Sequence, residues 1–512
     1  MTRVCLVAPR IPPAAMNFAF SMPLIEKRFS HLPLPLATVA ALTPPELEVA
    51  ILDENVEELR PEAVDAEVVG LTGIYCQRER LFELADAFRR RGSLVAIGGP
   101  IAQDLFDDCA RHADTVFVGE AEETWPRFCA DLRAGRVERT YRADGWANLS
   151  RAPIPRFELL KIDRYSSGCV QATRGCPYAC EYCDVPEKYG RQPRSKPVET
   201  VLEEVRRLSR LGCDSIFFVD DNFIGNRRYA KRLLEALARL LPTLGAPMYF
   251  YTQVTLNVAA DDELLALFHA ASFRRFFIGV ETSDRAQLSA LRKTHNLELE
   301  LPDALRRIQS YSITVWAGIM LGLDGDDPSS FDAQYRLIEE TGITPTLIGL
   351  LQAMPGAPLH ARAEAEGRLL ALPEVVGSGA LGSLAAQGRT NLVHRGLDER
   401  ALLRGFAAFV RRVYDPAAYG ERLLVARGRA SRELPSPWSV LTWGNLKAFA
   451  RLFAHYLRRS DAAERRMVAH VLASTLRAGG QGLDEVLFHL VIYKHLREFY
   501  TAAAEVAERA SA

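Results

Sequence analysis

The chain has 512 residues, 48% of them hydrophobic, and its 63 Lys and Arg nearly balance its 64 Asp and Glu. This length and apolar content predict two to four domains with separate cores, and the balanced charge gives no general attraction to nucleic acid. The start lacks the order of a signal peptide, and no stretch approaches the roughly 18 unbroken apolar residues that span a bilayer. These features predict a cytoplasmic protein that does not bind nucleic acid.

Residues 1–145 alternate between short apolar runs and amphipathic segments such as Arg80–Arg91, which is followed by Gly92. Apolar runs bounded by Gly, Pro or Asp are typical of buried parallel strands, and a glycine is a common helix stop. We therefore expect a doubly wound, Rossmann-like sheet whose ligand lies at the carboxyl ends of its strands. The expected strands are Val4–Ala8, Val49–Leu52, Val68–Thr72, Leu94–Ile97 and Val116–Val118.

Glycines follow three of these strands. They are Gly73, the pair in Gly98-Gly99-Pro100, and Gly119, which precedes Glu120. Glycine lets the backbone approach a flat or phosphate-bearing ligand closely. A tight turn between strand and helix explains any one of them, but three at the same edge of one sheet indicate a cofactor.

A proline-bearing linker, residues 146–165, leads into a second alternating region, residues 166–365. Six strand-helix units predict a partial (β/α)6 barrel with its chemistry in the loops that follow the strands. The expected strands are Cys169–Thr173, Ser215–Asp220, Met248–Val254, Arg275–Glu281, Val315–Leu321 and Thr346–Leu351.

Residues 366–512 are expected to form a mostly helical domain after a loop of small residues at Gly377–Gly388. An apolar stripe at helical spacing runs along this region. We expect the stripe to pack on its own domain, and the alternative is a surface that touches a membrane. Its members are Leu446, Phe449, Ala450, Phe453 and Leu457.

Three of the nine cysteines lie within eight residues, as Cys176, Cys180 and Cys183. Thiolates are the natural ligands of iron–sulfur clusters, and a cubane normally takes four of them. Three ligands on one loop can hold a 4Fe–4S cluster and leave its fourth iron open to chemistry. A structural zinc site is the alternative, but such sites usually use paired CxxC units and no second pair follows.

This loop resembles the CxxxCxφC signature of the radical-SAM superfamily, with Tyr182 at the aromatic position φ. The resemblance implies that S-adenosylmethionine (SAM) chelates the open iron and is cleaved to a 5′-deoxyadenosyl radical. It also implies an electron donor such as flavodoxin or ferredoxin. Asp221, after the second barrel strand, and Glu281, after the fourth, are then candidate SAM contacts with Tyr182; the alternative is that these acids cap the next helices.

The first domain, together with segments such as Tyr189–Lys196 and Gly349–Gly356, resembles the cobalamin-binding branch of that superfamily. Within the branch it looks most like the group with the hopanoid C-2 methylase and the bacteriochlorophyll side-chain methylases. There is no DxHxxG motif, and the first domain contains only His31 and His112, so a histidine below the cobalt is not expected. The cobalamin contacts implied are Gly73, Tyr75, Cys76, Gln77, Gly98, Gly99, Pro100, Gly119 and Glu120.

The resemblance implies a methyltransferase that adds a methyl group to an unactivated carbon of a small-molecule, lipid or isoprenoid substrate. A cobalamin enzyme that rearranges or cyclises its substrate without methylating it stays open. An RNA methylthiotransferase is a third hypothesis, because Cys5, Cys76 and Cys109 could hold a second cluster, but its basic RNA-binding tail is missing. A non-enzymatic iron–sulfur regulator would leave the open-iron loop unexplained.

Overall fold

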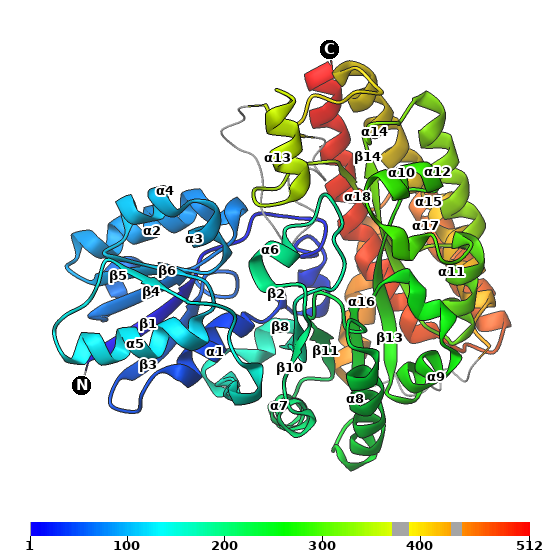
Figure 1. Cartoon of the computed structure of the whole chain (residues 1–512). Helices are drawn as coiled ribbons and strands as arrows, with labels where there is room; N and C mark the ends of the chain where they lie inside the picture. The colour runs from blue at the N-terminus through cyan, green and yellow to red at the C-terminus, as the bar shows by residue number, and fades with distance from the viewer. Residues whose placement is uncertain (1, 371–388, 432–442, 512) are drawn as a thin grey trace.

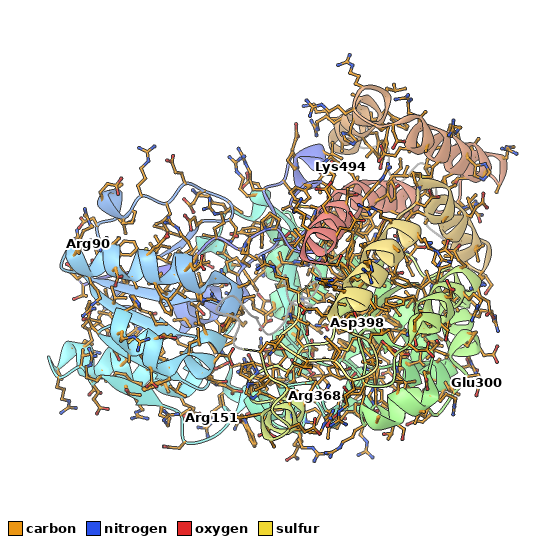
Figure 2. All side chains as sticks on the ribbon, turned by 90° about the horizontal axis from the view of Figure 1, so that it is seen from above. Arg90, Arg151, Glu300, Arg368, Asp398 and Lys494 are labelled. Carbon is orange, nitrogen blue, oxygen red and sulfur yellow. The ribbon has the colours of Figure 1, made fainter. Side chains whose placement is uncertain are left out.

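The chain folds into two lobes, each built on a parallel β-sheet (Figure 1). The computed structural model describes residues 2–370, 389–431 and 443–511. Seen from above, Arg90 lies at the far end of the first lobe and Glu300 at the far end of the second (Figure 2). The predicted loop at Gly377–Gly388 lies outside the described residues.

The first lobe is a six-stranded sheet in the order β3-β1-β4-β5-β6-β7, with every pair parallel. Helices α1 and α5 cover one face and α2, α3 and α4 the other, so the strands are buried on both sides and read as continuous apolar runs. The predicted doubly wound sheet is therefore present. Its elements are β1 (Arg3–Ala8), α1 (Leu34–Leu42), β3 (Glu48–Asp53), β4 (Val68–Thr72), α2 (Arg78–Arg90), β5 (Leu94–Gly98), α3 (Pro100–Asp104), α4 (Phe106–His112), β6 (Thr115–Val118), α5 (Ala121–Arg133) and β7 (Thr140–Arg142).

The second sheet has the order β15-β14-β13-β12-β11-β8-β2, again all parallel, and it curls into part of a barrel (Figure 1). The six predicted strands are present as β8 (Tyr165–Val170), β11 (Ser215–Phe218), β12 (Tyr249–Gln253), β13 (Phe273–Glu281), β14 (Thr314–Leu321) and β15 (Thr346–Leu350). Around them lie β9 (Thr173–Arg174), α6 (Val185–Tyr189), β10 (Arg194–Ser195), α7 (Val198–Arg210), α8 (Arg227–Leu240), α9 (Asp262–Ala270), α10 (Arg285–Ala290), α11 (Leu301–Ser310), α12 (Pro328–Thr341) and α13 (Pro358–Ala365).

The two faces of this curved sheet differ in burial. Phe218, Phe250 and Phe276 point outward, are fully buried, and pack among the aromatic side chains beneath α9. Their neighbours in sequence, such as Phe217 and Phe277, point to the inner face and are only half-buried. The inner face of the sheet therefore carries large apolar side chains that the rest of the protein covers only in part.

The seventh strand of this sheet comes from the first 31 residues of the chain. Strand β2 (Phe29–His31) pairs with β8 in the barrel sheet and not with the first lobe. Phe18, just before it, packs edge-on against Trp316 of β14, and Lys494 donates a hydrogen bond to the Phe20 carbonyl (2.7 Å; Figure 2). The expectation that residues 1–145 form one unit misses this excursion, because three residues carry no readable strand pattern.

The C-terminal region is helical, as expected, in its described part. The helices are α14 (Glu399–Val413), α15 (Pro416–Gly428), α16 (Trp443–Arg458), α17 (Ala462–Arg477) and α18 (Leu483–Ser511). Arg275 of β13 pairs with both carboxylate oxygens of Glu485 (2.9 and 2.7 Å), which ties α18 to the barrel. Across the described segments, none of the helices combines the length and the apolar character needed to cross a bilayer.

The apolar stripe of α16 does not pack as expected. Leu446, Phe453 and Leu457 are 42%, 38% and 71% exposed, whereas Leu452 and Tyr456 are buried. The prediction that the stripe packs on its own domain is therefore wrong for these three leucine and phenylalanine side chains, whereas Phe449 of the same stripe does pack against the core. The helix is turned so that a second, shorter set of apolar side chains faces the protein.

Candidate active site between the two sheets

The cysteine loop leaves β9 and ends at α6, on the side of the barrel that faces the first lobe (Figure 1). Gly175 has φ +97°, and a Cβ there would lie 2.8 Å from the Gly190 carbonyl oxygen, so only glycine fits. The Cys176 amide donates to that same oxygen (3.1 Å), and the Gly175 amide donates to Asp221 Oδ2 (2.8 Å). The first cysteine is thus fixed by backbone contacts.

The other end of the loop is fixed through Glu181. Its amide donates to the Leu291 carbonyl (2.9 Å), and its carbonyl accepts from the Leu359 amide (2.8 Å). Its carboxylate pairs with Arg362 (2.7 and 3.1 Å). A loop held at both ends presents its cysteines in a fixed arrangement, which a cluster with only three protein ligands requires.

The three cysteine thiols interact with one another electrostatically. Burial raises the pKa of Cys176 to about 11 and also raises the pKa values of Cys180 and Cys183. The thiolates therefore need a cationic partner, which iron supplies. Within the described residues, no three His, Cys, Asp or Glu side chains lie close enough to hold a single metal ion. The assignment of a cluster to these cysteines therefore depends on the loop that carries them and on the chemistry of their thiols.

A buried polar triad lies beside Cys180. Tyr182 Oη donates to Glu281 Oε1 (2.8 Å), and Lys293 Nζ lies 2.9 Å from the same oxygen and 2.8 Å from Tyr182 Oη. Burial lowers the pKa of Lys293, but the charge of Glu281 and the nearby thiols outweigh it and leave that pKa raised. Glu281 sits at the end of β13 with φ +66°, an unusual conformation for glutamate. Such strain is common at functional sites.

Asp220 and Asp221, which follow β11, support the loop rather than cap a helix. Asp220 is fully buried and accepts hydrogen bonds from Thr173 and from the Ala172 amide (3.2 Å). Asp221 accepts from Gly175, as described above. The structure therefore brings Tyr182 and Glu281 together with each other, while Asp221 lies at the opposite end of the loop.

Several buried polar atoms beside the loop lack a hydrogen-bond partner. They are Asn222 Oδ1, both ring nitrogens of His295, and Asn296 Oδ1. The His295 ring lies 3.9 Å from the ring of Tyr178, which belongs to the cysteine loop. Buried polar atoms are normally satisfied, so this group of orphaned donors and acceptors fits a polar ligand such as SAM.

The glycine-bearing turns of the first lobe meet at one edge, at the carboxyl ends of β4, β5 and β6. Gly99 has φ +85°, and a Cβ there would lie 2.3 Å from Thr72 Oγ1. Gly119 has φ +95° and would place a Cβ 2.8 Å from Ala143. Gly73, Gly98 and Pro100 line the same edge. The added Cβ atoms would meet side chains of the protein itself, so the tight turns require these glycines, and a ligand at this edge stays a prediction.

The predicted cobalamin contacts in the β4 turn differ in burial and in the contacts that they already make within the protein. Tyr75 and Cys76 are half-buried, and the Arg78 guanidinium lies 4.8 Å from the Tyr75 ring centre. Gln77 is buried, donates to the Pro9 carbonyl (2.5 Å) and accepts from the Ile74 amide (2.9 Å). Gln77 therefore supports the turn, and its contact with cobalamin stays a prediction, as do those of the other residues.

Neither histidine of the first 145 residues lies at this edge. His31 belongs to β2 and bonds Tyr251 of the barrel (2.9 Å). His112 ends α4, bonds Asp86 (2.9 Å) and stacks on Phe82. The expectation that no histidine lies below a bound cobalt stays a prediction.

Ion pairs that the sequence did not reveal join this edge to the cysteine loop. Glu120 is buried and binds Arg194 (2.8 and 2.6 Å) and Arg174 (3.1 Å), and it accepts from the Ala147 amide (2.7 Å). Arg174 also binds Glu122 (2.8 Å). The Glu120 side chain is thus already engaged between the lobes. The sequence does not reveal that these charged residues are buried, because ion pairs between the two lobes leave no pattern in the sequence.

A second buried ion pair crosses the same interface, where Lys188 of α6 bridges Asp104 of α3 (2.7 Å) and Asp184 (2.8 Å). Together these contacts fix the carboxyl edge of the first sheet against the loop that carries the three cysteines.

Comparisons with known proteins agree with this arrangement. The model of the radical SAM superfamily matches residues 170–338, and that of a domain of unknown function (DUF4070) matches residues 357–509. The chain belongs to the radical SAM superfamily, whose enzymes use a 4Fe–4S cluster and SAM.

Within that superfamily it belongs to the group of methyltransferases that includes the hopanoid C-2 methylase. It is 34% identical to that methylase of Rhodopseudomonas palustris over 375 residues, covering 72% of this chain and 71% of the relative. It is 36% identical to the uncharacterized methyltransferase sll1242 of Synechocystis over 371 residues, covering 72% and 69%. The resemblance to this group, predicted from the motifs, is confirmed, and the chain is a radical-SAM methyltransferase.

A solved structure has a similar fold over nearly the full length of the chain. The cobalamin-dependent S-adenosylmethionine radical enzyme OxsB, with aqua-cobalamin and S-adenosylmethionine bound, superposes with a TM-score of 0.63, covering 98% of this chain and 84% of that one. The sequences are 14% identical, so the likeness is one of fold.

Proposed function

We propose that the chain is a cobalamin-dependent C-methyltransferase of the cytoplasm that methylates an unactivated carbon of an apolar isoprenoid or lipid. The observation that carries this proposal is the junction of the two lobes. There the carboxyl edge of a doubly wound sheet, where such folds bind cofactors, is fixed by buried ion pairs against the cysteine loop.

The cofactors would supply the difficult chemistry, namely a radical that removes hydrogen from carbon and a methyl group to replace it. The chain supplies position. Cys176, Cys180 and Cys183 would hold the cluster, and Tyr182 and Glu281 would hold SAM beside it, with Asp221 fixing the start of the loop. The turns at Gly73–Gln77, Gly98–Pro100 and Gly119–Glu120 would bind cobalamin.

The inner face of the barrel supports an apolar substrate. Phe217 and Tyr251 stack at 4.8 Å on neighbouring strands, and Phe277 lies on the same face of the next strand. All three are half-buried, whereas Phe218, Phe250 and Phe276 on the outward face of the same sheet are fully buried. Accessible aromatic surface inside a fold is suited to a large apolar ligand. A relative of this chain is named for a methylation of hopanoids, which is consistent with this proposal.

The alternative of a second cluster for RNA methylthiolation finds little support. Cys5 and Cys109 are buried in the apolar core of the first lobe, and burial raises both of their pKa values to about 12. Cys76 lies in the β4 turn, outside that core. A rearrangement without methylation would need the same cofactors, so only the product separates it from methylation.

The test is to reconstitute the full chain with iron and sulfide under anaerobic conditions, and then to measure bound cobalamin and product. We expect about four irons and one cobalamin per chain. A product heavier by one methylene should form from an isoprenoid lipid extract, with reduced flavodoxin or ferredoxin as electron donor. An intact cluster without bound cobalamin would contradict the proposal, and about eight irons would favour the methylthiotransferase. An unchanged product mass would favour a rearrangement.

A further inference from the structure

Helix α16 presents a line of apolar side chains to solvent. Leu446, Phe453 and Leu457 stand at i, i+7 and i+11, so they lie on one face, and they are 42%, 38% and 71% exposed. Phe449, between the first two, is half-buried against the core. Among the described residues, nine large hydrophobic side chains are exposed, and three of them belong to this one helix. Scattered single exposures need no explanation, but a line of them on one helix indicates a contact surface.

The opposite side of α16 is occupied by the protein. Leu452 and Tyr456 are buried, and Tyr456 Oη donates to the Leu490 carbonyl of α18 (2.7 Å). The helix also packs on the 3₁₀ turn Met22–Ile25, and Arg451 binds the Leu24 carbonyl (2.9 Å). Because these contacts fix the rotation of the helix, the exposed line cannot turn inward without breaking them.

Positive charge lies beside the apolar line. At 3.6 residues per turn, Lys447 and Arg458 fall together on the flank that faces away from Leu452 and Tyr456, and both are exposed, whereas Arg451 is paired with Glu26. Arg459 follows directly, and the sequence of α16 contains no Asp or Glu. The solvent-facing half of the helix is therefore an apolar strip bordered by cations.

We propose that α16 is a membrane-docking helix that lies in the plane of an anionic lipid surface. Its leucines and phenylalanine would enter the boundary of the acyl chains, and its cations would meet the lipid phosphates, as in other interfacial helices. A second copy of this chain fits the face less well. Two-fold pairing would set a helix without acids against itself, so that cations face cations.

The inference is independent of the proposed substrate, because it depends only on the exposed side of α16. The experiment is flotation of the full, cluster-reconstituted chain with two kinds of vesicle, pure phosphatidylcholine and a 3:1 mixture with phosphatidylglycerol. We expect binding to the anionic vesicles that weakens as salt rises. Leu457→Glu and Phe453→Glu should each lower the partition constant roughly tenfold. The double reversal Lys447→Glu with Arg458→Glu should lower it by about 25-fold or more.

The matched control is Leu211→Glu at the end of α7, where a leucine is 40% exposed but stands outside any such line. It should bind vesicles like the wild type, and all variants should keep the wild-type melting temperature, iron content and SAM cleavage. Vesicle binding that is absent, or that falls equally in the Leu211 control, overturns the proposal. So does a loss of thermal stability in the Leu457 and Phe453 variants without vesicle binding, which would mean that the chain itself covers the face. A wild-type dimer that Leu457→Glu makes monomeric overturns it as well.

Discussion

Replacing Lys293 by methionine tests the triad beside the cysteine loop. The Lys293 side chain is 8% exposed and that of Glu281 is 5%, and the ammonium lies 2.9 Å from the carboxylate. Its removal leaves Glu281 buried with one neutral partner, the Tyr182 hydroxyl. Breaking a buried pair in this way costs about 3–5 kcal/mol. In a lobe of this size the cost corresponds to a fall in melting temperature of roughly 10 °C.

The assay is thermal unfolding of the full chain by circular dichroism, with four proteins compared: wild type, Lys293→Met, Glu281→Gln and the double variant. The double variant buries no unpaired charge, so it should recover more than half of the stability lost in Lys293→Met. A control variant is available in Lys196→Met, which breaks another buried pair, with Glu204 at 2.6 Å, in α7. It should lose comparable stability but keep SAM cleavage, which Lys293→Met should reduce. Wild-type melting of Lys293→Met, or no recovery in the double variant, would refute the reasoning.

Three further changes have defined outcomes. Gly175→Ala forces a Cβ against the Gly190 carbonyl at φ +97°, so the strain of about 1–3 kcal/mol should appear as a lower iron content after reconstitution, measured against Gly135→Ala on the surface. Glu120→Gln removes the shared charge between the lobes, and hydrogen exchange should become faster near Arg194; unchanged exchange would mean that the ion pairs do not hold the lobes together. Burial raises the pKa of Asp220 to about 7, so the folded state binds more protons than the unfolded chain between about pH 4 and 7. Stability should therefore fall as pH rises through that window, by at most about 1.4 kcal/mol per unit, and Asp220→Asn should flatten the dependence in urea titrations.

The sequence predicts local features of this protein well and long-range pairing poorly. The cysteine loop and the glycine turns are recognisable because spacing and residue type alone specify their chemistry. The strands of the first sheet are recognisable because burial on both faces gives uninterrupted apolar runs, and those of the barrel because the residues of both faces are largely apolar. The pairing of Glu120 with Arg194 could not be predicted, because two charges 74 residues apart carry no periodicity that links them.

The orientation of α16 shows a different limit. The apolar line that includes Leu446 and Leu457 is the stronger helical pattern, so periodicity assigns it to the core. The structure instead buries Leu452 and Tyr456, because the tyrosine hydroxyl gains a carbonyl partner on α18. A periodic pattern shows that a helix has an apolar face, but it does not show whether protein or another phase covers that face.

The position of strand β2 makes the order of folding depend on contacts between distant parts of the chain. It completes the barrel edge beside β8 although the first lobe lies between them in sequence, and the nearby Phe20 amide bonds His495 (3.3 Å) across 475 residues. Contacts of such separation form late, since a long loop must close before they contribute. During synthesis the first lobe can therefore mature early while its residues 14–31 wait for the last helix to leave the ribosome. A fragment starting at residue 166 would expose an unpaired strand edge and tend to aggregate.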